Sequence, residues 1–112
     1  MGEDKNPHID IKIELSRYCE KSFKKFSKKA DPKLLKAIKN IIAELKVNPQ
    51  LGKELSADLN GMRKIRLDTF NYRIVYELKT NPNVIIIHGI AHRKNVYDDV
   101  AKYLGLGYYD PD

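Results

Sequence analysis

Three segments of strand-like sequence follow one another in the second half of the chain, and only short turns separate them. Residues 62–67 and 72–78 alternate in side-chain character, and residues 84–92 form the most apolar run. Alternation with period two is typical of a strand with one buried face. The turns at residues 69–71 and 80–83 are too short for a crossover, so we expect a mainly antiparallel meander with residues 84–92 at its centre.

The first half of the chain predicts a strand followed by two helices. Residues 9–15 alternate strictly between apolar and charged side chains, which indicates a half-buried strand. Ser16 is placed to cap a first helix, and Asp31 with Pro32 to start a second helix that ends near Asn48. Almost no loop separates the two helices, so we expect an antiparallel helical hairpin.

The remaining segments complete an α+β architecture of the order β-α-α-β-β-β with a short C-terminal helix. Residues 50–60 are predicted to form a loop, and residues 96–104 carry a weak helical stripe. We therefore expect one domain over residues 1–112, with its core at about 9–104, a polar leader and an acidic tail.

Charge and cysteine content narrow the function. The chain has 21 Lys plus Arg against 15 Asp plus Glu, a net charge of +6, which favours a polyanionic partner. Cys19 is the single cysteine, so an internal disulfide or a cysteine-based metal site is excluded. No acidic cluster offers a Mg²⁺ site, and no apolar run is long enough for a membrane span. We expect a cytoplasmic protein with no membrane partner, no metal and no cofactor.

Several cationic and proton-carrying residues recur along the meander and suggest RNA cleavage without a metal ion. In that reaction a 2′-hydroxyl attacks its own phosphodiester, and arginine and lysine stabilise the charge that grows on the phosphate. Histidine or tyrosine can carry the proton. The candidate catalytic residues are Lys64, Arg66, Arg73, His92, Arg93 and Tyr97.

A second set of basic residues is a candidate RNA-binding surface that contacts phosphates without regard to sequence. Its members are Arg17, Lys21, Lys24, Lys25, Lys28, Lys53, Arg63 and Lys94. The alternative, a lysine-rich helix face that is simply solvated, stays open.

Other conspicuous residues are better explained by structure than by chemistry. Tyr72 and Tyr76 alternate with apolar residues and predict core packing, and Cys19 lies on the apolar stripe of the first helix. His88 lies within an apolar strand, about 13 Å from His92 at ~3.3 Å per residue, so the two cannot share one ion.

Four motifs occur in order: Leu-Ser-Ala-Asp-Leu-Asn-Gly ending at Gly61, Arg-Lys-Ile-Arg-Leu from Arg63, Asn-Tyr-Arg-Ile-Val-Tyr from Asn71, and His-Arg-Lys-Asn-Val-Tyr ending at Tyr97. With them the chain resembles the RelE/ParE toxin superfamily over residues 9–104. The resemblance implies a RelE-like fold and a toxin of a type II toxin–antitoxin system. RelE-like members cleave mRNA on the ribosome, whereas ParE-like members inhibit DNA gyrase.

The resemblance also implies roles for the candidate residues. Arg73 would contact the scissile phosphate, Arg93 would stabilise the transition state or protonate the leaving group, and Tyr97 would stack on a base or act as general base. Lys64 and Arg66 would bind the phosphate, and His92 would take part in proton transfer. Some relatives carry a glutamate base before the second strand of the meander, where this chain has Lys53 and Glu54.

The implied partners are a cognate antitoxin, the ribosome with its mRNA, and operator DNA only as a toxin–antitoxin complex. The alternatives are a ParE-like gyrase inhibitor without nuclease activity and an inactive relative that serves only as a co-repressor.

Overall fold

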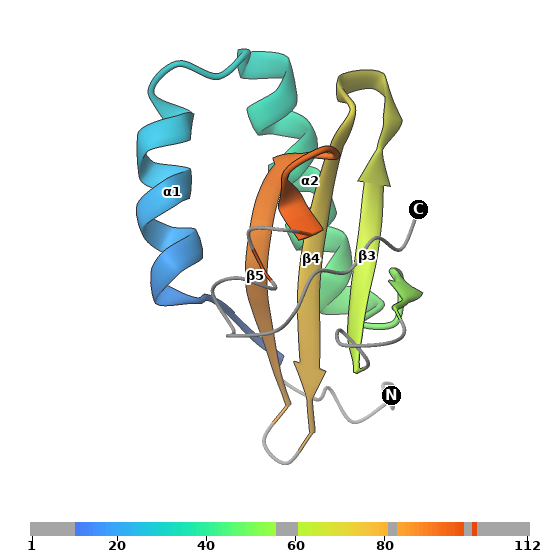
Figure 1. The fold of residues 1–112 in the computed structure, drawn as a ribbon. Helices are drawn as coiled ribbons and strands as arrows, with labels where there is room; N and C mark the ends of the chain where they lie inside the picture. The colour runs from blue at the N-terminus through green and yellow to red at the C-terminus, as the bar shows by residue number, and fades with distance from the viewer. Residues whose placement is uncertain (1–10, 56–60, 81–82, 98–99, 101–112) are drawn as a thin grey trace, which may run out of the picture.

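The computed structural model describes residues 11–55, 61–80, 83–97 and 100, and it has the expected α+β architecture (Figure 1). Five strands form one sheet in the order β1-β5-β4-β3-β2. Strand β1 runs parallel to β5, and the other neighbours are antiparallel. The elements are β1 (Lys12–Leu15), α1 (Arg17–Ser27), α2 (Pro32–Val47), β2 (Lys53–Glu54), β3 (Met62–Leu67), β4 (Tyr72–Lys79) and β5 (Val84–His92).

Both helices begin where the sequence predicts. The Ser16 hydroxyl accepts a hydrogen bond from the Cys19 amide at 3.1 Å, and the Asp31 carboxylate accepts one from the Lys33 amide at 2.8 Å. Each cap satisfies an amide that has no partner within its helix. Neither helix is long and apolar enough, among the residues that the structure describes, to cross a bilayer.

The helices cover one face of the sheet and bury the main core there (Figure 1). We call this side the helix face. Both helices and the inner strands contribute the buried side chains of this core: Cys19, Leu34, Ile38, Leu45, Ile65, Ile74, Tyr76, Ile85, Ile87 and Ile90.

The opposite side of the sheet, which we call the front face, carries a smaller apolar cluster of Leu55, Met62, Val75, Val96, Tyr97 and Val100. Helical backbone starts at Val96, and this short turn lies in front of β4 and β5 in Figure 1. It packs so closely on β5 that a Cβ atom at Gly89 would lie 2.6 Å from Val100 Cγ2. Most of the helix predicted for residues 96–104 lies outside the described residues.

Two expectations about the sheet are corrected. Residues 50–60 were expected to form a loop, but Lys53 and Glu54 form β2 and pair with Lys64 and Arg63. Strand β4 is the central strand, and β5 lies between β4 and β1. Strand β5 is nevertheless an interior strand, with β1 on one side and β4 on the other. An interior position is sufficient to cover the most apolar strand, because the short strands β1 and β2 form the edges of the sheet.

Candidate functional site

Strands β3 and β4 place three candidate cations on the front face. Lys64 and Arg66 alternate with Ile65 along β3, so they share the side of the sheet opposite the main core. Arg73 alternates in the same way with Ile74 on β4. Arg66 and Arg73 are direct cross-strand partners. The sheet therefore aligns two guanidinium groups side by side.

Asp68, in the 3-10 turn (Asp68–Phe70) that joins β3 to β4, contacts both arginines. Its Oδ1 atom lies 3.1 Å from Arg66 Nε and 3.6 Å from Arg73 Nη1. Directly opposed like charges destabilise a sheet, so a carboxylate between them offsets their repulsion. Asp68 is absent from the set of candidates that the sequence suggested. Its one local signal is that it is an acidic residue in an otherwise basic segment.

The two arginines differ sharply in their exposure to solvent. The side chain of Arg73 is 2% exposed, whereas those of Arg66 and Asp68 are 58% and 67% exposed. Arg73 Nη1 also donates a hydrogen bond to the Tyr72 carbonyl at 3.0 Å. Its Nε atom is buried and has no hydrogen-bond partner among the described residues. Arg73 is thus a fixed cation, and Arg66 is the more accessible one.

Tyr97 reaches the same face from the segment after β5. Its ring is almost fully buried in the front-face cluster, and Lys64 Nζ lies 5.7 Å from the ring centroid. That distance suits a cation–π contact. Lys53 is the cross-strand partner of Lys64 and is exposed. The front face therefore holds Lys53, Lys64, Arg66, Arg73 and Tyr97 together.

His92, in contrast, lies on the helix face. It is the cross-strand partner of Tyr72, and the two rings meet edge to face with centroids 5.9 Å apart. Tyr72 in turn packs on Phe26 of α1. The cause is a β-bulge: Val75 pairs with Gly89, but the next residue, Tyr76, pairs with Ile87. The additional residue in β5 reverses the alternation beyond it, so Ala91 instead of His92 takes the front-face position opposite Arg73.

Arg93 lies at the end of the sheet that carries the arginine pair. Its amide donates a hydrogen bond to the Asn71 carbonyl at 2.7 Å, which fixes the end of β5 against the β3–β4 turn. Its side chain is exposed. The following Lys94 amide donates to His92 Nδ1 at 3.2 Å, which holds the imidazole ring in place. The backbone of Arg93 and the Arg66–Arg73 pair thus share one end of the molecule.

The remaining basic candidates are dispersed. Five of them are exposed on α1 and at its C-terminal cap, on the other side of the sheet from the arginine pair: Arg17, Lys21, Lys24, Lys25 and Lys28.

Arg63, also a candidate, is engaged in contacts within the protein. Its Nη1 atom donates to the carbonyl of Gly52 at 2.7 Å and to that of Gln50 at 3.4 Å. Arg63 Nη2 lies 3.2 Å from Glu54. Arg63 is thus engaged in holding the segment around β2.

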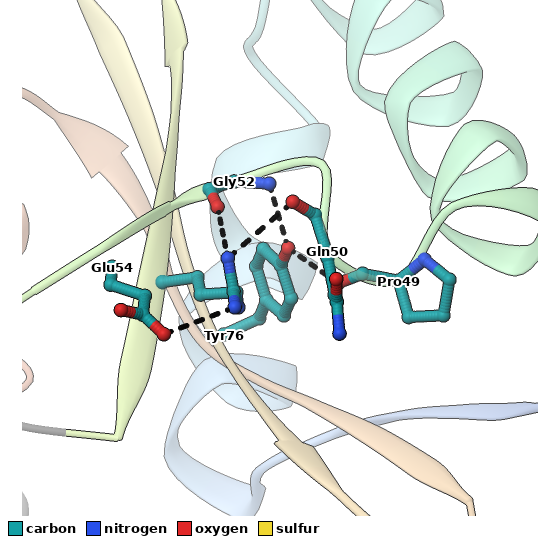
Figure 2. Close-up of polar contacts among 6 residues, drawn as sticks. Pro49, Gln50, Gly52, Glu54 and Tyr76 are labelled. Carbon is teal, nitrogen blue, oxygen red and sulfur yellow. Dashed lines mark hydrogen bonds and ion pairs between the residues drawn. The ribbon is translucent and has the colours of Figure 1, made fainter.

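Tyr76 anchors the same segment from the centre of the sheet. Its hydroxyl donates to the Pro49 carbonyl at 2.7 Å and accepts from the Gly52 amide at 2.8 Å (Figure 2). Burial raises the pKa of this phenol, although the bond from Gly52 and the charge of Arg63 act against the rise. A Cβ at residue 52 would lie 2.7 Å from the Tyr76 ring, so only glycine fits there. Tyr76 is a core residue, as predicted.

Cys19 and His88, which the sequence also marked as structural, are buried. Burial raises the pKa of the Cys19 thiol to about 12. His88 Nε2 lies 3.0 Å from Glu77 Oε1 at the bulge. The residues that the structure describes contain no group of three or more His, Cys, Asp or Glu side chains placed to hold a metal ion.

Comparisons with known proteins agree with this fold. The chain is 31% identical over 85 residues to a protein of Methanocaldococcus jannaschii whose name places it among the RelE toxins, and the match covers 76% of this chain and 88% of the relative. The structure is similar to the isolated Escherichia coli RelE toxin, with a TM-score of 0.60 and 18% identity, covering 83% of this chain and 97% of that one. It is also similar to a YoeB/ParE toxin from Agrobacterium tumefaciens, with a TM-score of 0.64 and 16% identity, covering 72% of this chain and 96% of that one.

A family match covers most of the described structure. The family described as "ParE toxin of type II toxin-antitoxin system, parDE" matches residues 13–97, from β1 to Tyr97. This span includes both helices, all of the sheet except Lys12, and the arginine pair. The chain therefore belongs to this toxin family, within the RelE/ParE superfamily.

Proposed function

We propose that this toxin arrests growth by cleaving mRNA in the ribosome without a metal ion. The observation that carries the proposal is the direct pairing of Arg66 with Arg73 on the front face, beside Lys64 and Tyr97. Guanidinium groups bind phosphate oxygens through charge-assisted hydrogen bonds, so a pair of arginines in register suits a phosphate ligand. Lys64 adds a third cation to the same surface.

The proposed reaction is attack of a ribose 2′-oxygen on the adjacent phosphorus, with departure of the 5′-oxygen. The products are a 2′,3′-cyclic phosphate or a 3′-phosphate and a 5′-hydroxyl. Arg66, Arg73 and Lys64 stabilise the charge that develops on the phosphate oxygens. Tyr97 stacks on a base or accepts the 2′-hydroxyl proton, and Arg93 assists the leaving group. His92 lies on the helix face, whereas the arginine pair lies on the front face. A catalytic role for His92 therefore requires the RNA to contact both faces at this end of the sheet.

The proposed partners follow from charge. Exposed lysines of α1, with Lys53 and Lys94, contact ribosomal RNA through salt-sensitive phosphate contacts. A cognate antitoxin with acidic segments covers the basic surface, and operator DNA is bound only by the toxin–antitoxin complex. Solved relatives include RelBE toxin–antitoxin complexes of Escherichia coli and Mycobacterium tuberculosis, which supports the antitoxin proposal.

A second candidate function is inhibition of DNA gyrase without nuclease activity. Two observations favour it: the position opposite Arg73 on β5 is Ala91, and His92 points to the helix face. The front face consequently has fewer groups for proton transfer than the sequence suggested. Inhibition by binding needs the cationic surface but no acid or base.

The direct test is a reconstituted reaction with ribosomes that hold a defined mRNA codon in the A site. The proposal predicts a cut within that codon, with a 5′-hydroxyl on the downstream fragment and a 2′,3′-cyclic phosphate or a 3′-phosphate on the upstream fragment. Gyrase supercoiling is measured in parallel with the same preparation. Intact mRNA together with inhibited supercoiling would overturn the proposal in favour of the second candidate.

A further inference from the structure

We propose that Asp68 is an intramolecular counter-anion that occupies the phosphate position of the Arg66–Arg73 pair in the free protein and withdraws when an RNA phosphate binds. This inference rests on the proposed function, because it assigns the phosphate to that pair. One Asp68 oxygen contacts both guanidinium groups, at 3.1 Å and 3.6 Å. In this role Asp68 is a positioning residue, since it holds the arginines and does not touch the reacting atoms.

The burial of Arg73 explains why the free protein needs an anion at this place. A guanidinium that is 2% exposed keeps its charge and must be compensated by hydrogen bonds or an opposite charge. The contacts described for its side chain are the Tyr72 carbonyl and Asp68. Its Nε atom has no hydrogen-bond partner among the described residues. Within the part of the chain that the structure describes, Asp68 is therefore the one counter-charge for Arg73, and it contacts this guanidinium at Nη1.

The exposure of Asp68 explains why it can be displaced. Its side chain is 67% exposed and belongs to a three-residue turn, and Arg66 is 58% exposed. The Arg66–Asp68 ion pair is weak because both partners are exposed and water screens them. A phosphate with two arginines makes stronger bidentate contacts than one carboxylate oxygen does. Binding of an RNA phosphate thus exchanges a weak internal contact for a stronger external one.

The test uses the full chain, inorganic phosphate as the probe, and NMR signals of the arginine Nε–Hε groups to measure phosphate affinity. Asp68→Asn removes the charge with little change in shape, and Asp68→Glu retains it. Glu54→Gln is the matched control, because Glu54 forms an ion pair with Arg63 at 3.2 Å and its loss changes the net charge equally. We expect Asp68→Asn to bind phosphate roughly two- to fivefold more tightly than wild type. We expect Asp68→Glu and Glu54→Gln to stay near the wild-type affinity.

Thermal unfolding gives a second readout that does not depend on NMR signals. Asp68→Asn should melt at a lower temperature than wild type in phosphate-free buffer, because Arg73 loses its counter-charge. Added phosphate should raise its melting temperature more than that of wild type, since a ligand of the folded state stabilises it in proportion to its affinity. The melting comparison therefore remains informative even if Asp68→Asn folds poorly in the absence of phosphate.

The outcomes separate this inference from the proposed function. Equal phosphate affinity in wild type and Asp68→Asn, or equal tightening in Glu54→Gln, would overturn the role of Asp68 and leave the nuclease proposal standing. Tighter phosphate binding in Asp68→Asn with no mRNA cleavage by wild type would support Asp68 and overturn the nuclease. An absence of any phosphate response at either arginine would overturn the role of Asp68, while the cleavage assay would decide the nuclease proposal separately.

Discussion

Arg66 of β3 and Arg73 of β4 are direct cross-strand partners, and the same Oδ1 atom of Asp68 contacts both guanidinium groups. A sheet register that aligns two cations has an electrostatic cost, which the turn between the strands offsets with its own carboxylate. The buried arginine is held rigidly, while the exposed one can adjust to a ligand. The proposed binding of an RNA phosphate relies on this combination.

The exposed member of the pair gives the cleanest test of the site. Arg66→Ala should leave the fold intact and lower the rate of mRNA cleavage roughly 10²-fold, because it removes charge stabilisation at the phosphate. The matched control is Lys36→Ala, which removes an exposed cation from α2. Cleavage of a ribosome-bound mRNA is the measurement. Equal activity of Arg66→Ala and the control would contradict the site.

The position of His92 predicts that its substitution lowers the cleavage rate less than Arg66→Ala does. His92→Gln should lower the cleavage rate less than tenfold, because the imidazole packs on Tyr72 at the helix face. Single-turnover cleavage assays would measure it beside Arg66→Ala. A loss as large as that of Arg66→Ala would show that His92 reaches the reacting atoms.

The Tyr76 hydroxyl predicts a stability effect that is independent of function. Tyr76→Phe should lower the free energy of unfolding by about 1–3 kcal/mol, because the Pro49 carbonyl and the Gly52 amide lose their partner. Tyr72→Phe deletes the same atom from a half-buried ring and should change stability by less than about 0.5 kcal/mol. Urea unfolding of both variants gives the comparison. Equal effects would contradict an anchoring role for Tyr76.

The buried thiol predicts both reactivity and pH dependence. With a pKa of about 12, Cys19 stays protonated in the folded protein at pH 8, so a thiol reagent should modify it far more slowly than in urea. Between pH 9 and 12 the unfolded chain loses this proton and the folded chain keeps it, so stability falls as pH rises. Cys19→Ala should reduce the fall of the unfolding free energy with rising pH. Part of the fall should remain, because the pKa of Tyr76 is also raised in the folded protein.

The features that the sequence predicted correctly depend on nearby residues. Caps at Ser16 and Asp31 and the alternation along β3 and β4 are decided within a few positions, and the structure has them. Strand β2 is two residues long and depends on Tyr76, which is distant in sequence, so residues 50–60 resembled a loop.

The bulge explains why the candidate site could be predicted only in part. Strict alternation through β5 would have put His92 on the front face, and one additional residue near His88 turned it away. The role of Asp68 could not be read from the sequence either, because it arises from the register that pairs Arg66 with Arg73. Local pattern places residues on strands, but register decides which of them meet.

Mapping the 5′ ends of cellular mRNA after expression of this chain tests the central claim most directly. Wild type should produce new ends at a fixed position within codons, and Arg66→Ala should produce far fewer at equal protein level. Intact mRNA accompanied by DNA breaks would contradict the claim and identify the chain as a gyrase inhibitor.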